Sequence, residues 1–193
     1  MALTILVTGF GPFPGAPVNP TGPLVKSLAH FRMSGVKIVT HIFPTSYAAV
    51  DRDLPKLIAR YRPQALLMFG LATKAQSLRI ETRARNTLSS LADVSGVVPS
   101  LRLIAPGRAI SHALPTPSRL LLAAARQARA PVALSNDAGD YLCNYLCWRA
   151  ALASQRARGP RMAAFVHVPP DLAAGDLARA GRALLKAAAA VFS

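Results

Sequence analysis

The sequence predicts an α/β protein in which helices pack on a sheet within a single domain. Short apolar runs of strand length alternate with longer segments whose apolar residues recur at helical spacing. The chain has 193 residues, a usual length for one domain with a sizeable core. We find no internal repeat, linker or low-complexity tail, and therefore expect one domain over residues 1–193.

The first strand is expected at Leu3–Thr8, a continuous apolar run closed by Gly9, as in a strand buried on both faces. The loop over residues 9–23 is too rich in glycine and proline for regular structure, and it follows a strand end, where sites of open α/β sheets usually lie. Its Gly9, Gly11 and Pro14 imitate a dinucleotide fingerprint only in part, because proline replaces the third small residue. We expect no nucleotide site here.

The remaining elements follow from the same two patterns. Helices are expected at Thr21 to about Phe31, Ala48–Tyr61, Ser118–Ala130 and Leu172–Val191. Strands are expected at Val36–Phe43, Ala65–Phe69, Leu101–Ala105, Pro131–Ser135 and Met162–Val168. Residues 78–86 alternate in polarity as in one strand, which places on one face Arg79, Glu81, Arg83 and Arg85.

Cys143 is a candidate nucleophile because it follows a turn and begins a helix. Residues 136–139 supply the turn, and Leu142, Leu146 and Ala150 form one apolar stripe of the helix. A thiol in the first turn lies near the positive end of the helix dipole and near unpaired backbone N–H groups, which favour a thiolate and can hold an oxyanion. A buried structural cysteine explains this stretch equally well.

The second cysteine, Cys147, lies one helical turn after Cys143, so a disulfide between them would close too small a loop to be useful. We therefore expect a reducing compartment, the cytoplasm. The pair has no second pair of ligands, and we expect neither a metal nor another cofactor. Residues 1–25 carry no charged side chain, but glycines and prolines interrupt them, so we expect no signal peptide and no membrane partner.

The formal net charge of +15 raises the question of a nucleic-acid partner. Such a partner requires basic residues that cluster on one face, usually with aromatic residues among them. Here the basic residues are scattered, and arginine outnumbers lysine eighteen to five, which indicates a composition bias over the whole chain. We expect no nucleic-acid partner.

Two further side chains are candidates for catalysis. Glu81, the only glutamate of the chain, lies between two arginines on its expected strand, and either forms a structural ion pair or orients another group. His167 lies inside an apolar strand, just before the prolines that end it, and a lone buried histidine is often structural. Together with Cys143, these residues make a constellation of nucleophile, base and orienting carboxylate plausible.

Several segments resemble, in order, the motifs of the pyroglutamyl peptidase I family, the pyrrolidone carboxyl peptidases, which are cysteine peptidases. The opening, cysteine and histidine motifs of the family are similar to Val7–Thr21 (VTGFGPFPGAPVNPT), Gly139–Asn144 (GDYLCN) and Phe165–Pro169 (FVHVP). Glu81, followed by Ala84 and Asn86, matches the family's glutamate segment. The resemblance covers nearly the full length of the chain.

The resemblance implies hydrolysis of the amide bond after an N-terminal pyroglutamyl residue, with peptides of that kind as the partners. It makes Cys143 the nucleophile, His167 the general base and Glu81 the group that orients the histidine. It also implies an α/β/α sandwich around a mixed, mostly parallel twisted sheet, assembled as a homodimer or homotetramer. No metal is required for this chemistry.

The same resemblance implies that Phe10 and Phe13 line an apolar pocket for the pyroglutamyl ring, with Thr45 and Tyr141 nearby. A five-membered lactam has one apolar face, one N–H and one carbonyl, which two phenylalanines and backbone groups can recognise. The alternative for the two phenylalanines is ordinary loop packing.

The chain also departs from the family. Where the family has a stretch resembling DARIPDNxG, this chain has SSLADVSG at Ser89–Gly96, which lacks the family's active-site arginine. Arg83 and Arg85 occupy positions that are usually apolar, and either one replaces the missing charge or both cover a surface or subunit contact. Two alternatives therefore stay open: a related hydrolase of another lactam or N-terminal group, and a catalytically weak binding homologue.

Overall fold

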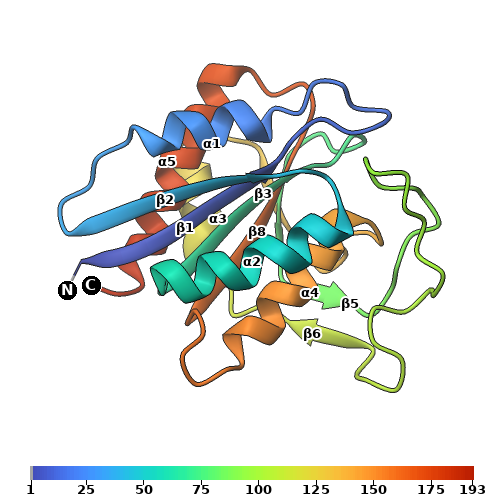
Figure 1. Ribbon diagram of the computed structural model, residues 1–193. Coiled ribbons are helices and arrows are strands. Elements are labelled where there is room, and N and C mark those ends of the chain that lie inside the picture. The colour runs from blue at the N-terminus through green and yellow to red at the C-terminus, as the bar shows by residue number, and fades with distance from the viewer. Residues whose placement is uncertain (1) are drawn as a thin grey trace.

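A six-stranded sheet forms the centre of the protein, and helices cover both of its faces (Figure 1). The computed structural model describes residues 2–193. The strands of this sheet are β1 (Leu3–Phe10), β2 (Val36–Phe43), β3 (Ala65–Leu71), β4 (Leu78–Glu81), β7 (Val132–Ser135) and β8 (Met162–Val168). The helices are α1 (Thr21–Ala29), α2 (Tyr47–Tyr61), α3 (Ser118–Gln127), α4 (Leu142–Ser154) and α5 (Ala174–Ala190). The predicted α/β/α sandwich is confirmed.

The sheet is mixed and mostly parallel, with the strand order β2-β1-β3-β8-β4-β7. The first four strands of this order run parallel, β4 is antiparallel to β8, and β7 is parallel to β4. The carboxyl ends of β1, β3 and β8 therefore meet the amino end of β4 at one end of the sheet. This arrangement brings Phe10, His167 and Arg79 to that end, although they are far apart in the sequence.

Each face of the sheet has its own hydrophobic core. One core packs the sheet against α1, α3 and α5, with side chains such as Val7, Phe69 and Val166. The other packs it against α2 and α4, with side chains such as Met68 and Phe165. Because side chains alternate along a strand, His167 lies on the same face as Phe165, the face that α4 covers. Within residues 2–193, no helix has both the length and the apolar character for crossing a membrane.

The prediction of one strand over residues 78–86 is wrong. β4 ends at Glu81, and the chain leaves the central sheet at Thr82, whose backbone N–H donates to the Ser135 carbonyl and whose carbonyl accepts from Leu114. The next strand, β5 (Arg83–Arg85), pairs instead with β6 (Ser111–Ala113) in a separate two-stranded sheet. Arg83 and Arg85 therefore do not share a strand face with Glu81.

Two other element predictions also need correction. Residues 101–105 form no strand, because the Asn86 side chain binds the backbone of Ala105 and the apolar Leu101 and Leu103 are exposed. β1 continues beyond its expected end to Phe10, since Gly9 keeps its register with β2. A Cβ at Gly9 would lie 2.9 Å from the Thr21 carbonyl oxygen, which explains the glycine inside this strand.

Candidate active site

Cys143 is the second residue of α4, and its sulfur lies against β3. A Cβ at Gly70 would lie 2.6 Å from Cys143 Sγ and 2.6 Å from Cζ of Phe165, so a glycine leaves the space that the thiol occupies. Gly70 is the register partner of His167 on β8. The thiol and the imidazole therefore lie at the same end of the sheet, where β3 and β8 finish, and line the same cavity.

The start of α4 is held in place by Asn144, which is fully buried. Its side-chain amide accepts a hydrogen bond from the Arg85 N–H at 2.8 Å and donates to the carbonyls of Arg85 at 2.8 Å and Thr87 at 3.2 Å. The amide thus pairs with β5 in the way a neighbouring strand would. This fixes the position of the helix turn that carries Cys143.

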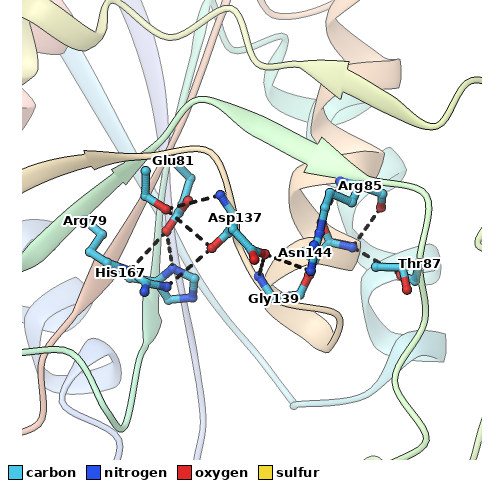
Figure 2. A network of polar contacts seen from close by, with 9 residues as sticks. Arg79, Glu81, Arg85, Thr87, Asp137, Gly139, Asn144 and His167 are labelled. Carbon is cyan, nitrogen blue, oxygen red and sulfur yellow. Dashed lines mark hydrogen bonds and ion pairs between the residues drawn. The ribbon is translucent and has the colours of Figure 1, made fainter.

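His167 is bound to Glu81 through a short hydrogen bond in the interior (Figure 2). Nδ1 lies 2.8 Å from Oε1 of Glu81, whose side chain is fully buried. An ionised carboxylate only accepts, so Nδ1 donates and Nε2 is left to take up a proton. The contact joins the second to last residue of β8 to the last residue of β4, which is 86 positions away in the sequence.

The resting thiol is protonated. Burial, together with the negative charge of Glu81, raises the pKa of Cys143 to about 12, although Arg79 opposes this shift. At the helix start, where the sequence predicts that the dipole favours a thiolate, the loss of solvent and the Glu81 charge act in the opposite direction. The proton of the thiol has to be removed by a base, and His167 lines the same cavity.

The amino end of α4 offers backbone N–H groups to an oxyanion. The first N–H groups of a helix have no partner within the helix, and the Tyr141 side chain makes no capping hydrogen bond to them. They lie beside Cys143 in the first turn. Such groups can bind the negative oxygen of a tetrahedral intermediate.

A cavity of about 320 Å³ opens above the thiol. The predicted site residues that line it are Phe10, Phe13, Thr45, Tyr141, Cys143 and His167. Glu81 does not line it, because it lies behind His167. A second cavity, of about 400 Å³, lies between α2 and α4, but no cysteine, serine or histidine of the described chain lines it.

The walls of the first cavity are aromatic. The ring centroids of Phe13 and Tyr141 are 6.2 Å apart, and Tyr47 meets Tyr141 edge-on at 6.1 Å. The Tyr141 hydroxyl donates to the Ala92 carbonyl at 2.8 Å, which ties this wall to the loop between β5 and β6. Thr45 is buried, and its hydroxyl donates to the Gly11 carbonyl at 3.1 Å, so it holds the loop after β1.

Arg83 and Arg85 lie outside this cavity, and both are exposed. The Arg83 guanidinium donates to Ser111 Oγ at 2.6 Å, and Arg85 forms an ion pair of 2.9 Å with Asp137. The hypothesis that one of them places a positive charge beside the thiol is therefore not supported. The arginine that does line the cavity is Arg79.

Some residues shape the site without taking part in the reaction, and the sequence alone does not identify them. Gly70 gave no signal, because a glycine inside an apolar strand does not reveal what approaches it. Asn19 and Thr21 order the loop after β1: Asn19 Nδ2 donates to the Gly11 carbonyl, and Thr21 Oγ1 accepts from the Phe10 N–H. Polar residues inside a proline-rich loop were the only available sign of this network.

Comparisons with known proteins show which family the chain resembles. The model of the family described as pyroglutamyl peptidase matches residues 3–185. The pyrrolidone-carboxylate peptidase of Thermococcus kodakarensis is 32% identical over 168 residues, which cover 86% of this chain and 81% of that protein. The corresponding peptidase of Oceanobacillus iheyensis is 28% identical over 187 residues, 91% of this chain and 94% of that protein.

A similar fold is found in solved structures. A mutant of the pyrrolidone carboxyl peptidase of the hyperthermophile Pyrococcus furiosus superposes with a TM-score of 0.92 at 24% sequence identity. The superposition covers 99% of this chain and 100% of that chain. At this identity the likeness describes the fold, and the function is argued from the site.

Proposed function

Since the chain belongs to the pyroglutamyl peptidase family, cysteine peptidases that remove N-terminal pyroglutamate, we propose that Cys143, His167 and Glu81 carry out this hydrolysis here. The observation that carries the proposal is the 2.8 Å hydrogen bond from His167 Nδ1 to the buried Glu81, next to a thiol in the same cavity. A nucleophile, a base and an orienting carboxylate are the parts that covalent acyl transfer requires.

In the first step, Cys143 Sγ attacks the carbonyl carbon of the pyroglutamyl residue while its proton passes to Nε2 of His167. Glu81 keeps the imidazole in the required tautomer and stabilises the imidazolium that forms. The carbonyl oxygen becomes negative and is bound by the N–H groups at the start of α4. A tetrahedral intermediate results.

In the second step, the intermediate collapses and the C–N bond breaks. His167 returns its proton to the leaving amine, so the shortened peptide departs neutral and a thioester joins the pyroglutamyl group to Cys143. A water molecule then attacks the thioester, with His167 again taking the proton. Pyroglutamate leaves, and the thiol is restored.

The pyroglutamyl ring binds between Phe10, Phe13 and Tyr141 in this proposal. These side chains supply the apolar walls of the cavity. Thr45 acts through the loop after β1, because its hydroxyl is already used by the Gly11 carbonyl. An open-chain N-terminal residue lacks the planar ring that such walls enclose, so it should bind less well.

The assay is cleavage of a pyroglutamyl amide of a fluorescent amine, compared with the matching prolyl amide, whose ring lacks the carbonyl. We expect turnover of the first substrate only, and loss of that turnover in Cys143→Ser. Cys147→Ser is the matched control, since Cys147 is fully buried one turn further along α4. Cleavage of both amides alike, or full activity of Cys143→Ser, would contradict the proposal.

Assembly as a homodimer or homotetramer is part of the proposal. Its support is the loop between β5 and β6, the long green segment on the right of Figure 1. Within residues 2–193, eleven large apolar side chains are exposed, and seven of them lie in this loop, namely Leu91, Val94, Val97, Val98, Leu101, Leu103 and Ile110. Exposed apolar patches commonly mark contacts between proteins. Light scattering after size-exclusion chromatography tests this, and a monomer at all concentrations would contradict it.

A cytoplasmic location completes the proposal. It is supported by the two cysteines, both of which are free thiols. The cytosol keeps thiols reduced, which protects a nucleophilic thiol from oxidation. Fractionation of cells with an antibody against the protein tests the location, and recovery outside the cytoplasm would contradict it.

A further inference from the structure

Arg79 is the one charged residue of β4 besides Glu81, and it faces the active site. In the antiparallel pairing of β4 with β8, Arg79 is directly opposite His167. Residues directly opposite in such a pair project from the same face of the sheet, and so does Glu81, two residues further along β4. The strand register thus gathers all three side chains on one face of the sheet, and Figure 2 shows them close together.

Arg79 shares the Glu81 carboxylate with His167. Its Nε lies 3.5 Å from Oε1, the same oxygen that accepts the proton of His167 Nδ1. This Nε is buried and makes no hydrogen bond within the described chain. A fully buried carboxylate without a cation beside it would be strongly unfavourable, and an imidazole that is to act as a base supplies no charge. Arg79 supplies it in the resting state.

The same guanidinium also reaches the loop that leads to Cys143. Arg79 Nη2 donates to the Asp137 carbonyl at 3.4 Å. Asp137 lies between β7 and α4, six residues before the nucleophile, and its side chain binds the Gly139 N–H at 2.9 Å. One side chain therefore bridges the orienting carboxylate and the turn before the nucleophile.

We propose that Arg79 is a positioning residue of the catalytic centre, which holds the Glu81 carboxylate and the turn before Cys143 in register and keeps a permanent positive charge beside the thiol. This inference rests on the proposed role of Cys143 as the nucleophile. A guanidinium suits this position because it stays charged at every working pH and its planar fork serves two acceptors at once.

The charge has a direct consequence for the thiol. Burial and Glu81 raise the pKa of Cys143, and Arg79 opposes them. When His167 has taken the proton, the centre holds a thiolate, an imidazolium, a carboxylate and the guanidinium, so the charges balance. The other titratable groups that face the thiol are Lys74, Asp140, Tyr141 and His167 in the cavity and Cys147 behind it.

The test compares Arg79→Met and Arg79→Lys with the native protein. Its readout is the rate of iodoacetamide alkylation of Cys143 as a function of pH, followed by peptide mapping. We expect Arg79→Met to move the midpoint of the profile upward by about one pH unit. At any pH below that midpoint, the alkylation rate should then be about tenfold lower than in the native protein. Arg79→Lys keeps the charge and should shift the profile less. The pH profile of kcat/KM on the pyroglutamyl amide should move in the same direction.

Arg83→Met is the matched control, because it removes an equal charge two residues past Glu81 and outside the cavity. Superimposable profiles of the native protein and Arg79→Met would overturn the proposal, as would an equal shift in Arg83→Met. A lower melting temperature without any shift would reduce Arg79 to a structural residue and also overturn it. Arg79→Gln gives the same comparison if Arg79→Met does not fold. Alkylation needs no substrate, so this result is independent of whether the pyroglutamyl amide is cleaved.

Discussion

The space for the nucleophile is made by a residue that has no side chain. Gly70 lies on β3 beneath the Cys143 sulfur and the Phe165 ring. Both neighbours are fixed, the first by the start of α4 and the second by a fully buried position in the core. A single methyl group here would therefore displace reacting atoms, because a packed interior does not yield freely.

Gly70→Ala should lower kcat/KM at least tenfold and the stability by about 1–3 kcal/mol, which is the usual cost of overpacking. Gly175→Ala is the matched control, because a Cβ at that position in α5 meets nothing within 4 Å. Kinetics on the pyroglutamyl amide and thermal unfolding of both variants measure the two effects. Native activity in Gly70→Ala would show that the sulfur has more room than the structure gives it.

Glu81→Gln should lower kcat by about two to four powers of ten, because an amide can still accept from His167 but no longer stabilises the imidazolium. The variant should remain folded, since the side chain keeps its volume. Stopped assays at saturating substrate give kcat, and circular dichroism gives the melting temperature. A variant that loses thermal stability but keeps its kcat would assign Glu81 to a structural ion pair.

At the scale of helices and strands, the amino end of α2 is capped by a residue from another segment of the chain. The Ser46 side chain makes no capping hydrogen bond, and the first turn of α2 has no acidic residue of its own. Asp93, from the loop between β5 and β6, supplies both the capping hydrogen bond and the negative charge at this helix end. Its Oδ2 accepts from the Tyr47 N–H at 3.1 Å, and its Oδ1 accepts from Ser95 at 2.8 Å and Val97 at 3.1 Å.

Asp93→Asn should lower the stability by about 1–3 kcal/mol at neutral pH. Burial raises the pKa of Asp93, but the N–H groups bound to the carboxylate outweigh it, and the net pKa is lowered. A carboxylate whose pKa is lowered by folding stabilises the fold at every pH above the ordinary Asp pKa of about 3.9. This stabilisation is lost as the pH falls through the lower pKa of the folded state. The difference in melting temperature should therefore shrink below about pH 4. The exposed Asp171→Asn is the control, and an equal effect there would contradict the assignment.

The helices and most strands of the central sheet could be predicted from the sequence, and the separate two-stranded sheet of β5 and β6 could not. β2 and β8 have the predicted bounds. β8 is a continuous apolar run that is buried along its whole length, whereas β2 lies at the edge of the sheet and is mostly half-buried. Residues 78–86 alternate in polarity without a break, so the departure of the chain at Thr82 has no local signal. β6 was missed because its pairing with β5 is a long-range contact of three residues.

The three proposed catalytic residues could also be predicted from the sequence. Cys143, Glu81 and His167 are rare residue types in this chain, and each lies next to a strand end or a helix start. The sequence leaves open whether Arg83 or Arg85 supplies a charge beside the thiol or both cover a surface, because it predicts a single strand over residues 78–86. Only the antiparallel register of β4 and β8 identifies Arg79 instead.

In the molecule as a whole, the mixed sheet is what brings the site together. The nucleophile comes from α4, the base from β8, the carboxylate from β4 and the aromatic walls from the loop after β1 and the turn before α4. An entirely parallel sheet would point the start of β4 away from the end of β8. The antiparallel pairing therefore places Arg79, near the start of β4, opposite His167, near the end of β8.

Detection of the acyl-enzyme tests the catalytic role of Cys143 most directly. The protein is mixed with a pyroglutamyl amide, quenched in acid within the first turnover and examined by peptide mass spectrometry. We expect one pyroglutamyl group on the peptide that contains Cys143, located by fragmentation to that residue, and none in Cys143→Ser. Turnover without any acylated peptide, or acylation at Cys147, would contradict this role.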